Sequence, residues 1–250
     1  MKRLGILILA LAMTLSLSAC GEKKDYEEAV ALYEAGDFEA AKEIFAELGE
    51  YEQASVYAHH CDFGIVGSEV LFGFTQEPYI VLDVQEGRSL LLADTLYAYR
   101  PDKDNPTHFG SQDFFGEDNW EESSIRQWLN GEYLEDSFTY WEDYILQTEH
   151  DGVKDYVFCL TAKEAEDYFA GSNDRQMLAS QQVLDRGTAY VSIYNTAGWW
   201  LMPEDGGYPY VDAYGDVVMN GTGFEWDVAL RPAFWLDHAA FMPVEEDAVE

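Results

Sequence analysis

Basic residues are scarce in this sequence. Its 250 residues include 14 Lys and Arg against 48 Asp and Glu, which gives a formal net charge of −34 at pH 7. Such a surface repels the phosphate backbones of nucleic acids and the head groups of anionic lipids. We therefore expect no nucleic-acid partner and no attachment to membranes through surface charge. The acidity fits a solvated surface, and it also fits a bound cation such as calcium.

Cysteine and histidine are rare as well. With three Cys and five His, the chain has neither a zinc-ligand spacing nor the cysteine pattern of a disulfide scaffold. Cys61 and Cys159 could pair in an oxidising compartment. We favour two free thiols, because Cys159 lies in the apolar run "DYVFCLT", where a buried thiol is the more common state.

Long apolar runs are also missing, apart from one near the start of the chain. That run begins at Leu4 and spans about 16 residues, which is short of the ~20 that a membrane-spanning helix needs. Lys2 and Arg3 precede it, and small residues lead from it to Cys20, as in a secretory signal peptide. The end of the run, "LSAC", resembles the lipobox of bacterial lipoproteins.

This resemblance implies that residues 1–20 hold a lipoprotein signal peptide and lipobox. In that family the cysteine is diacylated and becomes the new N-terminus, so the lipid would be attached to Cys20. Two acyl chains, such as palmitate, give stable anchoring where one gives only marginal binding. We therefore expect an extracytoplasmic protein that meets the cell membrane of a bacterium through its N-terminal lipid.

The usual motifs of catalysis are absent too. The sequence has no nucleophile elbow of the G-x-S-x-G kind and no phosphate-binding glycine loop. Carboxylates are so numerous that no catalytic pair stands out. A nucleophile and base would arise only if a serine met His108, His150 or His238 in space. We expect no enzymatic activity and no cofactor, with an unrecognised hydrolase as an alternative.

A helical pattern fills residues 21–62. Apolar side chains recur there at helical spacing, and the stretches "AGDF" and "LGEY" each interrupt them with a glycine. With Asp37 placed to cap the second segment, the pattern predicts three short helices of roughly 10 to 12 residues.

The stretch "LYEAGDFEAAKEIFAELGEYEQA" in this segment resembles the tetratricopeptide repeat over about one and a half units. Since a stable solenoid needs at least ~3 repeats, we interpret the segment as a spacer for the next domain. The alternative is a structural or assembly component whose helical module makes the contact with its partner.

From residue 65 the pattern changes to short runs of branched and aromatic residues, which predicts a mixed domain over residues 65–238 and an acidic tail over 239–250. One helix is expected from a cap at Asn119 to residue 138, with Ile125, Trp128 and Leu129 on its buried face. Further helices are expected at 141–149 and 162–169. Strands are expected at 68–75, 79–85, 89–99, 155–161, 189–195, 198–203, 208–221 (a hairpin turning at "AYGD") and 227–236.

Several of these stretches, in this order, resemble the bacterial family catalogued as domain of unknown function 6273. They are "NWEESSIRQWLN", "DYVFCLTAKEAEDYF", "GWWL", "YVDAYGDVVMNG" and "ALRPAFWL". The similarity covers roughly residues 66–237 and implies no established activity. One departure is Met202, which stands where the family typically carries an arginine.

The short terminal strands resemble more loosely the C-type-lectin-like and formylglycine-generating-enzyme-like folds, an analogy of fold alone. The expected fold class is α+β. A short helical hairpin module precedes a mixed domain of short antiparallel strands and two or three helices.

Aromatic residues supply the candidate binding site. Trp199 and Trp200 are adjacent on a predicted strand, so they point to opposite sides. One is expected to be buried, and the other to pack on a second layer or to line a surface. The candidates for ligand contact are the aromatics near turns: Tyr208, Tyr210, Tyr214 and Trp226.

Carboxylates supply the candidate metal ligands. Glu225 and Asp227 in "FEWDV" are candidates for calcium, and "RPDKDN" offers Asp102, Asp104 and Asn105. Arg231 is expected to form a structural ion pair or hydrogen bonds to the backbone. The sequence as a whole predicts a lipid-anchored, non-enzymatic surface protein that binds a protein or a glycan.

Overall fold

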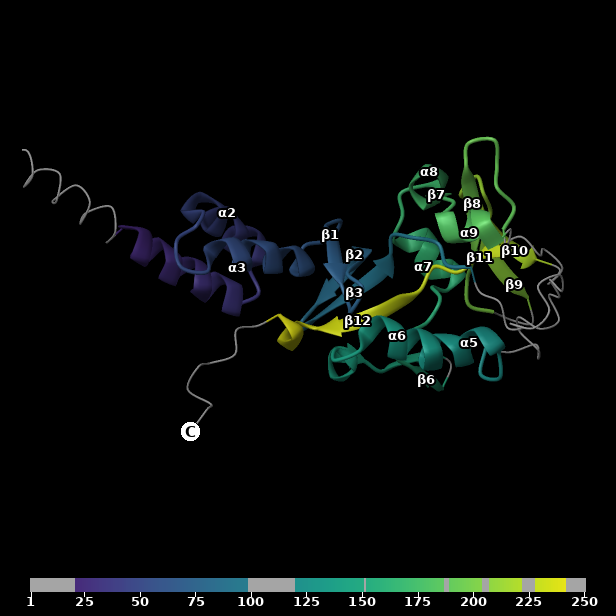
Figure 1. Ribbon diagram of the computed structural model, residues 1–250, viewed down its shortest axis with the longest axis horizontal. Coiled ribbons are helices and arrows are strands. Elements are labelled where there is room, and N and C mark those ends of the chain that lie inside the picture. The colour runs from purple at the N-terminus through teal and green to yellow at the C-terminus, as the bar shows by residue number, and fades with distance from the viewer. Residues whose placement is uncertain are drawn as a thin grey trace, which may run out of the picture. The chain divides into compact units, whose positions relative to one another are not determined.

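The computed structural model describes residues 21–98, 120–150, 152–186, 189–203, 207–221 and 228–241. The chain divides into two compact units. Figure 1 colours the chain by residue number, from purple at the N-terminus to yellow at the C-terminus. The helical unit takes residues up to Ser68 together with Phe241, and the α+β unit is Glu69–Ala240. Helices in the first unit and antiparallel strands with helices in the second confirm the α+β class.

The described part of the helical unit has the three helices that the spacing predicts. They are a helix over residues 21–34, α2 (Phe38–Leu48) and α3 (Ala54–Cys61), and a short 3-10 turn, η1 (Asp62–Gly64), follows α3. Asp37 caps α2 through a hydrogen bond donated by the Ala40 backbone.

Aromatic rings fill the interior of the helical unit. The rings of Phe45 and Tyr57 stack with centroids 5.1 Å apart, and Tyr33 meets Tyr57 edge-on at the same distance. The Tyr33 hydroxyl donates a 2.8 Å hydrogen bond to the carbonyl of Phe241. Phe241 therefore packs with the helices of this unit, although it is distant from them in the sequence. Burial raises the pKa of the Cys61 thiol here to about 12.

Both described cysteines are buried and free, which agrees with the favoured prediction. Burial also raises the pKa of Cys159, in the α+β unit, to about 12. Thiols with such pKa values stay protonated at neutral pH, so they act as small apolar side chains.

The first sheet of the α+β unit has the strand order β1-β2-β3-β12-β4, and every neighbouring pair is antiparallel. The predicted turn in "QEGR" joins β2 to β3, with Gly87 at a φ of 74°. The strands are β1 (Glu69–Phe72), β2 (Glu77–Gln85), β3 (Arg88–Ala93), β4 (Ile145–Leu146) and β12 (Ala233–Asp237).

A helical segment packs on this sheet and runs beside β12 in Figure 1. It consists of α5 (Ser124–Trp128), a π-helical turn (Leu129–Tyr133) and α6 (Leu134–Phe138). The ring of Phe138 lies 4.7 Å from that of Phe234 on β12. The contact buries the apolar side of the segment.

The start of this helix was predicted wrongly. It begins at Ser124, because the Ser123 hydroxyl accepts a hydrogen bond from the Arg126 backbone and provides the cap. Glu121 therefore precedes the helix, and Asn119 lies outside the described residues. On the predicted buried face, Ile125 and Leu129 are buried and Trp128 is half-buried.

The second sheet has the order β10-β9-β8-β11, with β7 paired to β8 on the side of that path. The predicted hairpin is confirmed, since Val217 pairs with Val211 and Val218 with Tyr210. β8 and β11 are parallel, and the other pairs are antiparallel. The strands are β7 (Met177–Leu178), β8 (Thr196–Trp200), β9 (Tyr208–Val211), β10 (Val217–Gly221) and β11 (Val228–Ala229).

Several local predictions differ from the structure. The strand expected at 227–236 is split into β11 and β12, which belong to different sheets. Residues 141–149 hold a 3-10 turn, η3 (Glu142–Tyr144), followed by β4 and by β5 (Thr148–His150), because Ile145 pairs with β12. The strand expected at 155–161 ends early, at β6 (Val153–Asp155), which pairs with β5. The stretch 189–195 is a turn, in which only Val191 forms an isolated bridge among the described residues.

The remaining described helices are short. The predicted helix at 162–169 is observed as α7 (Ala162–Asp167), whose capping box joins Thr161 to Glu164. The others are α8 (Ser172–Arg175), α9 (Gln181–Arg186) and a closing 3-10 turn, η4 (His238–Ala240). Of the helices the structure describes, none has the length and apolar character needed to cross a bilayer.

Candidate functional site

Three exposed tyrosines lie close together in the α+β unit, and we call them the tyrosine surface: Tyr190, Tyr194 and Tyr214. Their exposed fractions are 52%, 66% and 47%. A hydrogen bond with the Tyr190 side chain raises the pKa of Tyr214, and repulsion from Asp212 and from ionised Tyr190 and Tyr194 acts in the same direction. The three phenols come from two separate turns, which a 2.6 Å hydrogen bond from the Thr196 hydroxyl to the Ala213 carbonyl joins.

The first turn, residues 190–196, is held by a chain of buried hydroxyls. The Thr196 hydroxyl donates a 2.6 Å hydrogen bond to the Ala213 carbonyl, which leaves Ser192 Oγ to donate to Thr196 Oγ1 at 2.6 Å. Ser192 Oγ also accepts from the Tyr194 backbone at 3.1 Å. Asn195 takes a φ of 64°, which an asparagine tolerates better than most residues. These bonds join the first turn to the second.

The second turn, residues 212–216, is the tip of the β9–β10 hairpin. One oxygen of Asp212 accepts hydrogen bonds from the backbones of Tyr214 and Asp216, at 2.8 and 3.0 Å. From α8, Arg175 Nε donates to the Gly215 carbonyl at 2.8 Å, and Gln176 just beyond α8 donates to the Tyr214 carbonyl at 3.0 Å. The backbone beneath Tyr214 is therefore fixed before any ligand arrives.

The predicted contact residues have different positions. Tyr214 belongs to the tyrosine surface, whereas Tyr208 and Tyr210 lie half-buried on β9. Trp226 lies outside the described residues. The calcium candidates Glu225, Asp227, Asp102, Asp104 and Asn105 and the predicted lipid-attachment residue, Cys20, also lie outside them.

Tyr190 and Tyr194 were missed as candidates because "AYVSIYN" alternates like a strand. A signal was nevertheless present, since Ser192 and Asn195 are common turn formers.

The paired tryptophans are core residues. Trp199 and Trp200 are both buried, on opposite sides of β8, and Trp199 Nε1 donates to the Arg175 carbonyl at 3.1 Å. Met202 is buried as well, with its backbone N–H bonded to the Leu160 carbonyl at 2.8 Å. This position is thus an interior one in this chain.

Arg231 forms the backbone hydrogen bond and the ion pair expected of it. Nε donates to the Ala93 carbonyl at 2.8 Å, and Nη2 lies 3.7 Å from a carboxylate oxygen of Asp94. The guanidinium also lies over Trp199, 5.2 Å from the ring centroid. Burial lowers the pKa of Arg231 to about 10, so it remains charged at neutral pH.

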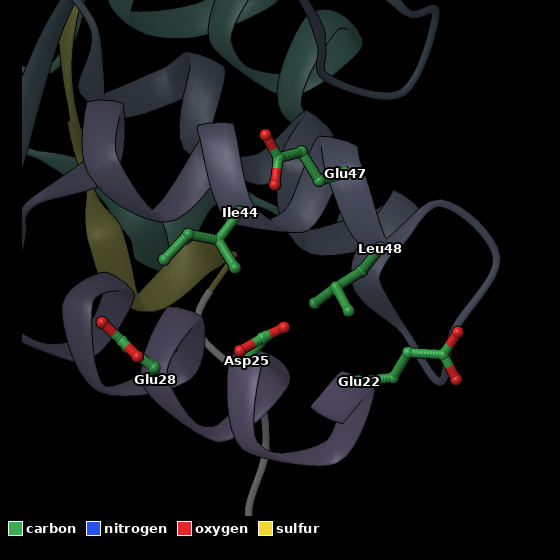
Figure 2. Close-up of a pocket in the computed structure, with 6 residues that line it drawn as sticks. All are labelled: Glu22, Asp25, Glu28, Ile44, Glu47 and Leu48. Atoms are coloured by element: carbon green, nitrogen blue, oxygen red, sulfur yellow. The ribbon is translucent and has the colours of Figure 1, made fainter. Parts of the chain in front are cut away.

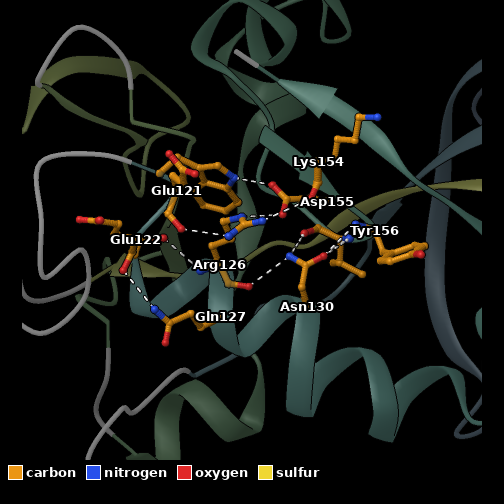
Figure 3. A network of polar contacts seen from close by, with 11 residues as sticks. Glu121, Glu122, Arg126, Gln127, Asn130, Lys154, Asp155 and Tyr156 are labelled. Carbon is orange, nitrogen blue, oxygen red and sulfur yellow. Dashed lines mark hydrogen bonds and ion pairs between the residues drawn. The ribbon is translucent and has the colours of Figure 1, made fainter. Parts of the chain in front are cut away.

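A buried polar network joins the helical segment to residues 153–157 (Figure 3). The carboxylate of Asp155 is buried, and it accepts hydrogen bonds from Trp120 Nε1 at 2.7 Å and from Arg126 Nε at 2.6 Å. Asn130 accepts from the backbones of Tyr156 and Val157 and donates to the Val157 carbonyl at 2.8 Å.

This network, which we call the Asp155 network, explains two features of the sequence. Asn130 occupies the backbone groups of residues 156–157, so the expected strand stops at Asp155. Trp120, Arg126 and Asn130 all come from the stretch "NWEESSIRQWLN". That motif therefore has a structural role: it joins the helical segment to residues 155–157.

A serine does meet one of the three candidate histidines. Ser89 Oγ and His238 Nε2 lie 2.8 Å apart, and both residues are buried. Burial lowers the pKa of His238 to about 4. A general base acts best with a pKa near the working pH and within reach of substrate, so we interpret this pair as a core hydrogen bond.

The helical unit has an open groove of about 410 Å³ between the helix over residues 21–34 and α2 (Figure 2). Four carboxylates and two aliphatic side chains line it. The lining residues are Glu22, Asp25, Glu28, Ile44, Glu47 and Leu48. Nowhere among the described residues do three or more acidic, His or Cys side chains form a group that could hold a metal ion.

The fold and these contacts define a mixed α+β domain with an exposed aromatic surface on fixed turns. The chain belongs to the family described as domain of unknown function (DUF6273), whose model matches residues 86–238. The match begins just after β2, which ends at Gln85. It therefore leaves out β1 and β2, although both belong to the same sheet as β3 and β12. Comparison with curated proteins finds no match, and comparison with solved structures finds none.

Proposed function

We propose that this protein is a non-enzymatic binding module, held on the outer side of a bacterial cell membrane by a lipid on Cys20. The tyrosine surface is the observation that carries the binding part of the proposal. Tyrosine gives a large contact area and loses little conformational entropy on binding. Since both turns are fixed by hydrogen bonds in the free protein, little ordering remains for a ligand to induce.

A binding comparison tests this function. The full chain and a variant with Tyr190, Tyr194 and Tyr214 all replaced by Leu are immobilised at equal density. Cell-wall glycan fragments and purified extracytoplasmic proteins of the same cells are then passed over both. We expect at least one ligand to bind the full chain and to lose that binding in the variant. Equal binding of every ligand to both proteins would contradict the proposal.

The lipid anchor is a separate part of the proposal, supported by the lipobox resemblance at "LSAC". A Cys20→Ser variant should pass to the soluble fraction after a carbonate wash, whereas the unchanged chain should remain with the membrane. A Cys20→Ser variant that stays membrane-bound would contradict the anchor and leave the binding proposal intact. The resemblances to the tetratricopeptide repeat and to the C-type-lectin-like and formylglycine-generating-enzyme-like folds remain predictions.

A second candidate function is an assembly component that acts through the helical unit. The open groove favours it, because Ile44 and Leu48 of α2 are partly exposed in it and offer apolar contact between two helices. Replacing both with Lys should then abolish complex formation while the substituted tyrosine surface has no effect. The opposite result would favour the tyrosine surface.

A further inference from the structure

The tyrosine surface carries negative charge next to its rings. Asp212 is held beside Tyr214, because its carboxylate bonds to the backbones of Tyr214 and Asp216. Asp216 itself is exposed. The guanidinium of Arg175, in contrast, is half-buried beneath the turn, with its Nε bonded to the Gly215 carbonyl. The described charged groups on the hairpin tip are thus acidic.

The charge of the whole chain has the same sign. A formal charge of −34 repels anionic polymers and attracts cationic ones from a distance. A neutral glycan would gain nothing from this field. A cationic protein segment would gain both from the field and from contact with the rings.

The faces of tyrosine rings attract cations directly. An ammonium or guanidinium group over such a ring gains stabilisation from the ring quadrupole, and carboxylates nearby add to it. Tyr190, Tyr194 and Tyr214 offer three exposed phenols, and Asp212 and Asp216 lie in the same turn as Tyr214.

We infer that the tyrosine surface binds a segment of a partner protein that carries several lysine or arginine side chains. The inference rests on the proposed function, because it names the ligand of the same surface. In the complex, the cationic side chains lie over the phenol rings, and the carboxylates of the hairpin tip face the remaining positive charge.

Two peptides provide the probe. The first is a fluorescein-labelled peptide of alternating lysine and serine, and the second is the same peptide with every lysine ε-acetylated. Binding to the full chain in neutral detergent is followed by fluorescence anisotropy. We expect the acetylated peptide to bind about tenfold more weakly or worse, because acetylation removes the charge and leaves the backbone unchanged.

Three variants separate ring contact from the general field of the acidic chain. Replacing all three tyrosines with Leu should weaken the lysine peptide about tenfold, while replacing them with Phe should change it by no more than about threefold. Tyr140→Leu is the matched control, because Tyr140 is 82% exposed in another part of the same unit. It should leave affinity within about twofold of the unchanged protein. Unchanged melting temperatures would show that each variant is folded.

The results distinguish this inference from the proposed function. Equal binding of both peptides, with both lost in the Leu variant, would overturn the cationic ligand and retain the binding surface. Binding of the lysine peptide that survives in the Leu variant would overturn the inference, because the general field alone would then account for it. If the Leu variant also keeps its binding of N-acetylglucosamine oligomers and cell-surface proteins, the proposed function fails too.

Discussion

The Asp155 network and the tyrosine surface belong to the same unit and use polar and aromatic side chains in opposite ways. In the Asp155 network, a carboxylate closed off from water accepts hydrogen bonds from a partly buried guanidinium and from a buried indole N–H. At the tyrosine surface, the buried bonds lie beneath the turns and the rings remain in solvent. In the Asp155 network the polar groups bond to one another within the fold. At the tyrosine surface the rings are free to contact a ligand.

The difference shows where stability and binding can be separated. Substitutions in the Asp155 network should change the free energy of unfolding strongly, since they leave a buried polar group or a partly buried charge without its partner. Substitutions of the exposed rings should change it little. Substitutions of the residues that fix the two turns should affect both stability and ligand binding.

The largest effect is expected for Asp155→Ala. It leaves Trp120 Nε1 without its acceptor and the Arg126 guanidinium without its carboxylate, although Arg126 keeps its bonds to the Glu121 and Lys154 carbonyls. Because the Arg126 side chain is also 25% exposed, the expected loss is about 3–4 kcal/mol, the lower part of the range for breaking a buried pair. Urea denaturation measures the change. Asp143→Ala removes an exposed carboxylate from the same unit and should stay within about 0.5 kcal/mol. Equal effects of the two substitutions would show that the network contributes little.

A smaller loss, about 2–4 kcal/mol, is expected for Gly215→Ala at the hairpin tip. Gly215 has a φ of 86°, and an added Cβ would lie 1.8 Å from the Ser172 carbonyl oxygen. Gly87→Ala is the control, because Gly87 has a φ of 74° with open space around its Cβ position. That variant should lose only about 1 kcal/mol.

Gly215→Ala should also weaken ligand binding, because Tyr214 would move with its turn. If Gly215→Ala destabilises the protein and leaves affinity unchanged, the tyrosine surface does not depend on a fixed hairpin tip. Calorimetric melting and anisotropy on the same samples make that comparison.

The sequence predicted the regular parts of the fold well. The helices of the helical unit, β1 to β3, the β9–β10 hairpin and α7 follow from periodicity and turn chemistry alone. The failures came where a distant residue decides the local structure. Asn130 ends the strand at Asp155, and pairing with β12 draws Ile145 out of a helix. Such contacts between distant parts of the chain are invisible in a local pattern.

The candidate site was predicted less well, for a related reason. Tyr214 stood out because it lies in a recognisable hairpin turn, and the structure places it in the tyrosine surface. Tyr190 and Tyr194 did not stand out, since the turn that exposes them depends on Thr196 reaching the Ala213 carbonyl. One of the stretches that resemble the family, "NWEESSIRQWLN", holds Trp120, Arg126 and Asn130, which bond to residues 155–157.

His238 tests whether a buried polar group that is uncharged also contributes to the stability of the fold, as the Asp155 network does. Its pKa is lowered by burial to about 4, from 6.5, so between these values the unfolded chain binds a proton that the folded chain does not. Stability from this group is therefore present above pH 6.5 and is lost as the pH falls towards 4. His238→Gln keeps a polar group near Ser89 and removes the titration.

The measurement is the fall in melting temperature between about pH 7 and pH 5, which should be larger for the unchanged chain than for His238→Gln. The comparison between the two proteins cancels the contribution of the many carboxylates, which titrate in both. An identical fall would show that His238 is protonated in the folded protein. It would also reopen the question of a base at this position.

The smallest effect on stability is expected for Tyr194→Leu. The ring is 66% exposed, and a surface substitution of this kind stays within about 0.5 kcal/mol. Tyr133→Leu is the matched change in the same unit. There the phenol is buried, and its hydroxyl lies 3.2 Å from that of Tyr79, so about 2 kcal/mol or more should be lost. Urea denaturation of both variants decides the point. If Tyr194→Leu is as costly as Tyr133→Leu, Tyr194 is a packing residue and the tyrosine surface is smaller than we propose. If Tyr194→Leu leaves the free energy of unfolding unchanged and weakens binding, the exposed ring contributes to ligand contact and not to packing.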